Sequence, residues 1–214
     1  MLNEKVSTMT MIISDIQKYL KDAMVIFVDD HSTDKETLDG FSLLAAGEHV
    51  CVIQNEGHGQ ERALYTGIQH ATTQYIACVD CDGQDPIQAL ENMYRVLLKK
   101  HVYAVAGIRI TRDDPTFRIM GAKLYHILFQ KLLGRKVPAI SNFFIVHESV
   151  KKSIDPDFVR GAVYRVLTAI YIPYKRRARP DGKSRFTFWK LWKVAKAGLR
   201  FAKTGDRYVC EKVS

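Results

Sequence analysis

The chain has 214 residues, of which 47% are hydrophobic and 26% charged, the composition of an ordinary soluble globular protein with one sizeable core. It contains no run of roughly 20 apolar residues and no basic N-terminal stretch followed by an apolar core, which argues against a membrane span and a secretory leader. We therefore expect a protein that stays in the cytoplasm.

The formal net charge of +9 is distributed unevenly along the chain. Residues 1–98 carry six basic and fifteen acidic side chains, whereas the remaining residues carry 26 basic and eight acidic ones. This asymmetry predicts an anionic partner for the second half, namely a membrane surface, a nucleic acid or a phosphorylated substrate. A basic surface that is merely solvated is the simpler alternative.

Helical and strand patterns alternate in the first half. Apolar residues at helical spacing predict a helix within residues 1–22, and Ser32 or Thr33 is expected to cap the helix that follows the first strand. The other predictions are strands at 24–28, 50–53, 75–79 and 102–108 and helices at 61–70 and 87–99. Such alternation predicts an α/β fold with a mostly parallel, doubly wound sheet.

The second half is predicted to add two strands and two helices to this core. A helix should run from about residue 119 to a C-cap at Gly134, and the last helix should span 187–203. That last helix is amphipathic and combines aromatic with basic side chains, which suits an anionic membrane surface, although a helix packed on the domain would look similar. The remaining predictions are strands at 142–146 and 169–174, a basic turn at 175–185, a catalytic domain at 1–174 and a membrane-facing appendage at 175–214.

The acidic segment after the strand at 75–79 is the strongest local candidate for chemistry. Gly83 and Pro86 prevent the strand from continuing, so Asp80, Asp82 and Gln84 are expected on a loop at its carboxyl end. In open α/β sheets ligands bind at that edge, and carboxylate and amide oxygens suit Mg²⁺ or Mn²⁺. A solvated acidic turn is the alternative. Zinc is not expected, because the Cys78-x-x-Cys81 spacing has no second pair.

Five segments, in this order and spacing, carry a resemblance over nearly the whole chain. They are Val28 to Asp34, Asn55 to Gln60, Asp80 to Pro86, Gly107 to Arg109 and Gly182 to Phe186. Together they resemble family 2 glycosyltransferases of the GT-A fold, within them the polyprenyl-phosphate glycosyltransferases typified by dolichol-phosphate mannose synthase. Each segment alone is weak evidence, and the five in register are specific.

The resemblance implies a role for each matching residue. Asp80, Asp82 and Arg109 would be catalytic, and Asp80, Asp82 and Gln84 would hold Mg²⁺ or Mn²⁺ with the donor diphosphate. The implied nucleotide-binding residues are Glu4, Asp29, Asp30 and Asp80. The implied phosphate-binding residues are Arg109, Arg118, Arg179, Lys183, Ser184 and Arg185.

The implied activity is metal-dependent transfer of a sugar from a UDP- or GDP-sugar to a polyprenyl phosphate at the inner face of the membrane, as in cell-envelope polysaccharide synthesis. Diphosphate and lipid phosphate repel by roughly 4 kcal/mol per pair of unit charges at ~4 Å and a dielectric of ~20, which a cation and arginines offset. Residues 140–144 contain no Asp or Glu to act as a general base. A phosphate acceptor, which needs no base, is therefore favoured. A homo-oligomer or a membrane-protein partner stays open.

Three other interpretations remain. Family members begin with an apolar strand that ends in a nucleotide-contacting motif, and Met1 to Glu4 matches only its tail, so the first strand is expected to be missing. A truncated, catalytically impaired glycosyltransferase fragment is therefore the main alternative. Asp29, Asp30 and Asp80 also resemble the acids of a receiver domain, but Ala106-Gly107 stands where that fold needs Ser or Thr. No recognised nucleic-acid motif accompanies the basic charge, so we expect no nucleic-acid partner.

Overall fold

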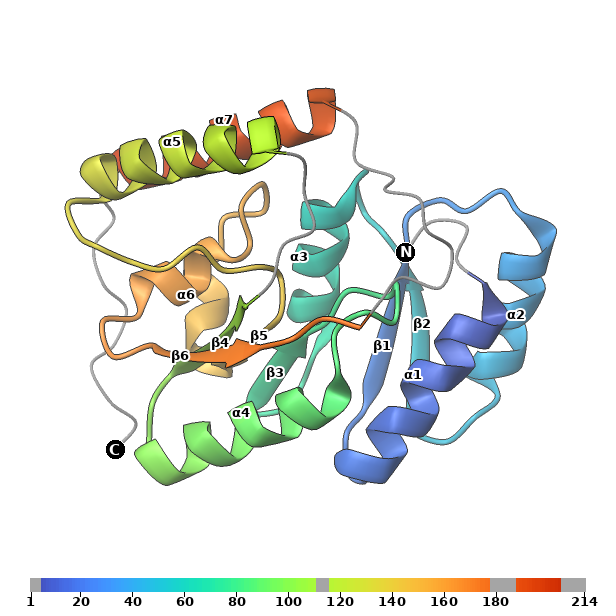
Figure 1. The fold of residues 1–214 in the computed structure, drawn as a ribbon. Coiled ribbons are helices and arrows are strands. Elements are labelled where there is room, and N and C mark those ends of the chain that lie inside the picture. Colours follow the sequence, from blue (N-terminus) through green and yellow to red (C-terminus); the bar gives the residue numbers. More distant parts are fainter. Residues whose placement is uncertain (1–4, 111–115, 178–187, 205–214) are drawn as a thin grey trace.

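A computed structural model of the chain describes residues 5–110, 116–177 and 188–204, and in it helices and strands alternate as predicted (Figure 1). The elements are α1 (Val6–Tyr19), β1 (Val25–Asp29), α2 (Lys35–Ala45), β2 (Val50–Gln54), α3 (Gln60–His70), β3 (Tyr75–Cys78), α4 (Ile87–Lys100), β4 (Ala104–Arg109), α5 (Thr116–Leu133), β5 (Phe144–His147), the 3₁₀ helix η1 (Glu148–Ser153), α6 (Gly161–Arg165), β6 (Ile170–Tyr174) and α7 (Phe188–Thr204). Every strand and helix expected from the sequence is present, and η1 and α6 are additional.

The strands form two separate sheets. β1 and β2 pair in parallel, and β3, β5, β4 and β6 form a four-stranded sheet in that order. β5 runs antiparallel to both of its neighbours, whereas β4 and β6 are parallel, so the larger sheet is mixed. The α/β prediction is confirmed. Among the described residues, β1 and β3 belong to different sheets.

Alternation along the strands of the larger sheet builds two hydrophobic clusters on its opposite faces. Ala104, Ala106, Phe144 and Val146 belong to the cluster that contains the α5, α6 and α7 side chains. The alternate residues belong to the other cluster, together with Ile87, Leu90, Met93 and Leu97 of α4. Both faces of this sheet are therefore covered, and its strands are fixed at the centre of the domain.

Helices α5 and α7 lie side by side on the α6 side of the larger sheet (Figure 1). A side chain at Gly198 of α7 would collide with the Tyr125 hydroxyl of α5 and approach the Phe158 ring, so the absence of a Cβ allows this close packing. Among the described residues, no helix is both long enough and apolar enough to cross a bilayer.

The cap of α2 differs from the prediction. Asp34, not Ser32 or Thr33, is the N-cap, because its carboxylate accepts hydrogen bonds from the Thr37 amide at 3.0 Å and the Thr37 hydroxyl at 2.9 Å. The Ser32 amide instead donates to the carboxylate of Asp29 at 3.1 Å. The segment after β1 thus makes one extra turn before the helix begins.

Candidate functional site

The acidic loop lies where several strand ends meet, as expected from its position after β3. Gly83 has a φ of 69°, a left-handed conformation that turns the chain back toward α4. Register pairing of Arg109 with Tyr174 brings the ends of β4 and β6 to the same edge, so Arg176, two residues beyond β6, reaches the acidic loop. Asp80, Asp82, Gln84, Arg109 and Arg176 all line one cavity of about 2,890 Å³.

The guanidinium of Arg176 occupies the centre of this site. It contacts oxygen atoms of all three predicted metal ligands: Asp80 Oδ2 lies 2.8 Å from its Nη2, Asp82 Oδ1 lies 3.7 Å from the same atom, and Gln84 Oε1 lies 2.9 Å from its Nη1. The three oxygens therefore converge on one cationic group. The structure brings the predicted metal-binding set together, with an arginine among its members.

A buried carboxylate holds Arg176 in place. Asp85 is 3% exposed, and its Oδ1 accepts hydrogen bonds from Arg176 Nε at 2.7 Å and from the Tyr174 hydroxyl at 2.8 Å. The Tyr174 hydroxyl also lies within 3.4 Å of Arg109 Nε, which donates to it. Asp85 and Tyr174 therefore orient the two arginines that face the acidic loop.

Asp80 is the most perturbed acid of the site. Burial raises its pKa to about 6, the charges of Asp85 and Asp82 contribute in the same direction, and Arg176 and Arg109 oppose them. Arg109 Nη2 lies 3.7 Å from Asp80 Oδ2, and Gln60 Nε2 donates to Asp80 Oδ1 at 2.6 Å. The Asp80 carboxylate is thus contacted by Gln60 of α3, Arg109 of β4 and Arg176 of the segment after β6.

The predicted nucleotide-contacting acids differ in position. Asp30 lines the cavity, and its Oδ1 accepts hydrogen bonds from the Gly59 amide at 2.8 Å and from Asn55 Nδ2 at 2.7 Å. Asp29 is buried and binds the Ser32 amide. In this structure both carboxylates organise loops around the ends of β1 and β2, and only Asp30 faces the cavity.

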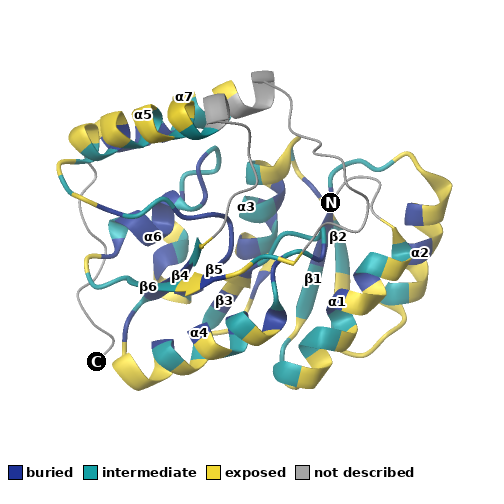
Figure 2. Ribbon diagram, in the orientation of Figure 1, coloured by how far each residue is buried: buried dark blue, intermediate teal, exposed yellow. Residues whose placement is uncertain are grey.

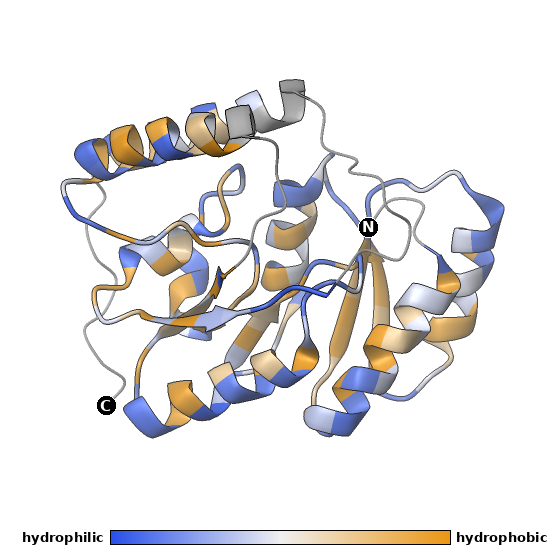
Figure 3. Cartoon of the chain, in the orientation of Figure 1, coloured by the Kyte–Doolittle hydropathy of each residue, from blue (hydrophilic) through white to orange (hydrophobic). Residues whose placement is uncertain are grey.

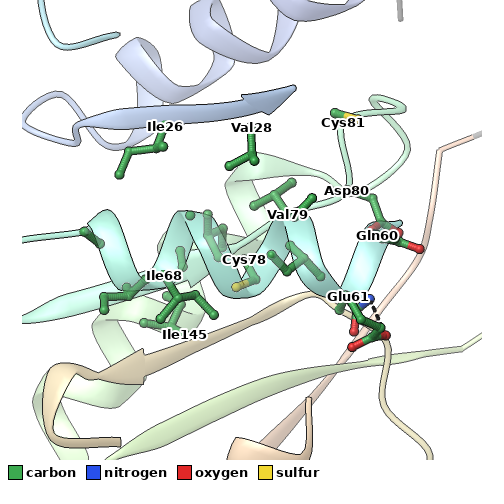
Figure 4. Close-up of a pocket in the computed structure, with 18 of the residues that line it drawn as sticks. Ile26, Val28, Gln60, Glu61, Ile68, Cys78, Val79, Asp80, Cys81 and Ile145 are labelled. Carbon is green, nitrogen blue, oxygen red and sulfur yellow. Dashed lines mark hydrogen bonds between the residues drawn. The ribbon is translucent and has the colours of Figure 1, made fainter. Parts of the chain in front are cut away.

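Two acids and one arginine of the site were not singled out from the sequence. Glu61, in the first turn of α3, lines the cavity, and its carboxylate accepts hydrogen bonds from the Val159 amide at 2.7 Å and from Asn142 Nδ2 at 3.4 Å (Figure 4). Asp85 lies in the acidic segment and Arg176 in the basic turn, and neither was among the predicted site residues. No sequence signal distinguished Arg176 within the basic run, because its place in the site depends on the parallel pairing of β6 with β4.

Several predicted site residues lie outside what the structure describes. Arg118 belongs to α5, but its side chain is not among the described ones. The others in this group are Glu4, Arg179, Lys183, Ser184 and Arg185. Their assignments to nucleotide and phosphate stay predictions.

The donor atoms suit a hard divalent cation. Among the described residues, no three His, Cys, Asp or Glu side chains stand close enough together to hold a metal ion by themselves. Two carboxylates and one amide oxygen around a single cationic group do fit Mg²⁺ or Mn²⁺, since these ions keep waters and complete their shell with substrate phosphates. Asp80, Asp82 and Gln84 are therefore a suitable set for a shared, substrate-completed site.

Comparison with known proteins gives one family. A model described as "Glycosyl transferase family 2" matches residues 3–155. The chain is 27% identical over 188 residues to an undecaprenyl-phosphate 4-deoxy-4-formamido-L-arabinose transferase of Enterobacter sp. (strain 638), covering 80% of this chain and 55% of that protein. It is 26% identical over 185 residues to a prophage bactoprenol glucosyl transferase homolog of Escherichia coli (strain K12), covering 82% and 60%. The chain thus spans a little over half the length of these relatives.

Solved structures show the same fold. Glucosyl-3-phosphoglycerate synthase from Mycobacterium tuberculosis in complex with phosphoglyceric acid has a TM-score of 0.69 at 15% identity, with 96% of this chain and 77% of that chain covered. The same enzyme in complex with Mn²⁺, UDP-glucose and glycerol 3-phosphate has a TM-score of 0.68 at the same identity and coverage. At this identity the likeness establishes the GT-A-like architecture alone.

Proposed function

This chain belongs to glycosyl transferase family 2, and from that premise we propose that it transfers a sugar from a UDP- or GDP-sugar to a polyprenyl phosphate with the help of Mg²⁺ or Mn²⁺. The names of the two sequence relatives support the acceptor class, since both act on bactoprenol or undecaprenyl phosphate. The complex of the structural neighbour with Mn²⁺ and UDP-glucose supports the donor class and the cation.

The donor diphosphate would lie at the end of the cavity lined by Asp80, Asp82 and Gln84. A divalent ion held there would neutralise charge on the leaving diphosphate. Arg176 lies 2.8–3.7 Å from these three oxygens, so a divalent ion held by Asp80, Asp82 and Gln84 would take over its contacts and leave its guanidinium for phosphate. Arginine is well suited to this exchange, because its guanidinium binds carboxylate and phosphate with the same planar geometry.

Arg109 would serve both substrates. Its Nη2 is 3.7 Å from Asp80 Oδ2, close enough to be attracted but beyond a good hydrogen bond, so the group keeps donors for an incoming phosphate. We propose that Arg109 and Arg176, with the basic turn at 179–185, screen the repulsion between diphosphate and lipid phosphate. Asp30, which lines the cavity, would face the nucleoside, and Asp29 and Glu4 would support that pocket.

The acceptor side favours a phosphate nucleophile. Ser141 and Asn142 replace the acid that a hydroxyl acceptor would need in this segment, and both are largely buried. The Glu61 carboxylate lies beside Asn142, but its two oxygens accept hydrogen bonds from Asn142 and from the Val159 amide. Glu61 is therefore assigned a positioning role, and the attacking phosphate supplies its own negative charge.

Membrane attachment is proposed through α5 together with α7. Five large apolar side chains of α5 are exposed and recur at helical spacing. Figure 2 shows exposed residues along α5, and Figure 3 shows hydrophobic residues along the same helix. The five side chains are Met120, Leu124, Ile127, Leu128 and Leu132. On the neighbouring helix α7, Trp192 is 51% exposed and Lys196 Nζ lies 5.5 Å from its ring centroid, which pairs an aromatic side chain with a basic group. These features support the proposed peripheral location at the inner face of the membrane.

The observation that carries the proposal is the convergence of three metal-type oxygens and two arginines at the end of a single cavity. The test is transfer of radiolabelled sugar from a panel of UDP- and GDP-sugars to undecaprenyl phosphate in detergent, with Mn²⁺ present. Asp82→Asn and Gln84→Ala should abolish the lipid-linked product, and Asp39→Asn, an exposed acid on α2, is the matched control. Full transfer by the Asp82 and Gln84 variants would refute the metal assignment.

A catalytically impaired fragment is the second candidate, and the split between β1 and β3 favours it. Such a fragment would keep the fold and the acidic site but would hold the donor poorly, because the sheet beside the cavity is divided between β1 and β3 in the described part of the chain. In the same assay it would give no product with any donor, while Mn²⁺ would still bind with Asp80 and Asp82 in place.

A further inference from the structure

Asn142 lies beside the acidic loop although the two are distant in sequence. β3 and β5 are antiparallel, and Cys78 at the end of β3 pairs with Phe144 at the start of β5. Asn142 precedes β5 by two residues and Asp80 follows β3 by two residues, so both lie at the same end of the strand pair. Both residues also line the cavity. Asn142 therefore stands at the edge of the predicted metal site.

The Glu61 carboxylate determines how the Asn142 amide is oriented. Glu61 Oε2 accepts a hydrogen bond from the Val159 amide at 2.7 Å, and Glu61 Oε1 accepts one from Asn142 Nδ2 at 3.4 Å. A carboxylate accepts hydrogen bonds, so the opposite amide orientation would set two acceptor oxygens against each other. Asn142 Nδ2 thus faces Glu61, and Asn142 Oδ1 faces away from it. Figure 4 shows Gln60, Glu61 and Asp80 gathered at one end of α3, so this pair lies next to the metal set.

The Asn142 oxygen is a buried acceptor that needs a hydrogen-bond donor. Asn142 is 6% exposed, and its Oδ1 is shielded from solvent and has no hydrogen-bond partner among the described residues. Buried side-chain oxygens of folded proteins almost always accept a hydrogen bond. Because Asn142 lines the cavity, the missing donor can come from a molecule bound there. The 3.4 Å bond to Glu61 is near the upper limit for a hydrogen bond, so the amide can turn slightly toward such a group.

The order of the strand ends indicates which part of a nucleotide-sugar would reach Asn142. Under the proposed function, the nucleoside lies near Asp30 after β1 and the diphosphate lies near Asp80 after β3. β5 is the neighbour of β3 in the larger sheet, on the side away from β1 (Figure 1). A nucleoside, a diphosphate and a sugar laid in sequence across these ends bring the sugar to the start of β5, where Asn142 lies.

A sugar also has the chemistry that the Asn142 oxygen needs. Sugar hydroxyls donate hydrogen bonds, whereas the diphosphate and an ionised lipid phosphate present acceptor oxygens. Arg109 and Arg176 supply donors for those phosphates. The preceding Ser141 already has a partner, because its Oγ lies 3.2 Å from the Tyr174 hydroxyl. The unpaired acceptor therefore favours the transferred sugar over either phosphate.

We propose that Asn142 is a specificity-determining residue whose Oδ1 accepts a hydrogen bond from one hydroxyl of the transferred sugar, and that Glu61 positions its amide. The inference rests on the proposed function and adds a requirement to it. The preferred nucleotide-sugar carries a hydroxyl at the ring position that reaches Asn142, and a sugar without a hydrogen-bond donor there binds more weakly.

The test is calorimetric binding, in Mn²⁺, of the UDP- or GDP-hexose that the unaltered chain binds most tightly, and of analogues in which each ring hydroxyl in turn is replaced by fluorine. Fluorine nearly keeps the size of the group but cannot donate. In the unaltered chain one replacement should weaken binding by about tenfold or more, and in Asn142→Leu the same replacement should matter by less than about twofold. UDP or GDP alone should bind both proteins equally, which shows that the metal set is intact.

Two further variants separate recognition from packing. Asn142→Asp keeps an acceptor oxygen and should retain the roughly tenfold preference for the hydroxyl. Asn92→Leu changes an exposed asparagine of α4 and is the matched control, which should behave like the unaltered chain.

Three outcomes would overturn the proposal. The same response to every fluorine replacement in Asn142→Leu and in the unaltered chain would show that no sugar hydroxyl depends on Asn142, while the transfer activity stands. Loss of the preference in Asn142→Asp as well as in Asn142→Leu would assign Asn142 to packing beside Glu61. No binding of UDP, GDP or their hexoses by the unaltered chain would overturn the proposed function together with this inference.

Discussion

Replacing Arg176 with alanine should destabilise the metal-free protein far more than replacing its neighbour Arg177. The Arg176 side chain is 17% exposed and hydrogen-bonds Asp85, Asp80 and Gln84 at 2.7–2.9 Å. Its removal leaves the fully buried Asp85 side chain with the Tyr174 hydroxyl as its one remaining side-chain donor among the described residues. Breaking a buried ion pair by removing one partner costs about 3–5 kcal/mol, and we expect the lower end because Arg109 remains near Asp80.

The matched control is Arg177→Ala. Arg177 is 44% exposed and pairs with Asp15 at 2.8 Å, a surface ion pair that contributes about 1 kcal/mol or less. In a domain of this size, 1 kcal/mol corresponds to a shift in melting temperature of roughly 2–4 °C. Thermal and urea unfolding in EDTA should therefore show a drop near 10 °C for Arg176→Ala and at most a few degrees for Arg177→Ala.

Mn²⁺ supplies the second half of this prediction. With the guanidinium gone, a divalent ion should bind among Asp80, Asp82 and Gln84 and recover part of the lost melting temperature, whereas Arg177→Ala should gain no more from Mn²⁺ than the unaltered chain. Equal losses for the two arginine variants, or a Mn²⁺ effect of the same size in both, would refute the assignment of Arg176 as the cationic group that holds the acidic loop.

Three further predictions follow from the site and its surroundings. Asp80 has a folded-state pKa of about 6, above its ordinary 3.8, so the native state binds more protons than the unfolded state between about pH 4 and 6. In EDTA, the contribution of Asp80 to the free energy of unfolding should therefore fall by as much as roughly 3 kcal/mol as the pH rises through that window. Urea titrations of the Asp80→Asn variant should lack this dependence on pH. Glu61→Gln should keep transfer to lipid phosphate within about tenfold, since a loss of 10²–10⁴-fold would instead identify Glu61 as the general base of a hydroxyl acceptor. Leu124→Glu combined with Ile127→Glu should abolish flotation with anionic liposomes while leaving Mn²⁺ binding unchanged, and flotation that survives both changes would count against α5 as the membrane-contacting face.

The alternation of strands and helices could be predicted because each strand is a short apolar run and each helix carries an apolar stripe. The acidic loop could also be placed, since Gly83 and Pro86 end the strand ahead of it. Residues near an element boundary were harder to assign. Asp34 caps α2 although Ser32 and Thr33 come first, because Asp29 already binds the Ser32 amide and delays the helix start.

The role of Arg176 illustrates what a single sequence withholds. Arg176 lies in a basic run, and the sequence does not show which residue of that run points into the site. Arg176 does so because β6 pairs in parallel with β4, which brings the end of β6 close to Asp80 and Asp85. Glu61 was missed for a similar reason, because its partners Asn142 and Val159 are distant in sequence and become neighbours only through packing of α3. Long-range neighbours of this kind leave no periodic signal.

The central claim is that the oxygens now gathered around Arg176 bind a cation together with a nucleoside diphosphate. Calorimetric titration with UDP and with GDP, in EDTA and in Mn²⁺, tests it most directly. We expect Mn²⁺ to tighten binding of one of the two nucleotides by at least about tenfold, or ~1.4 kcal/mol, and Asp82→Asn to remove that gain while Asp39→Asn retains it. Binding of UDP and GDP that is absent or identical with and without Mn²⁺ would contradict it.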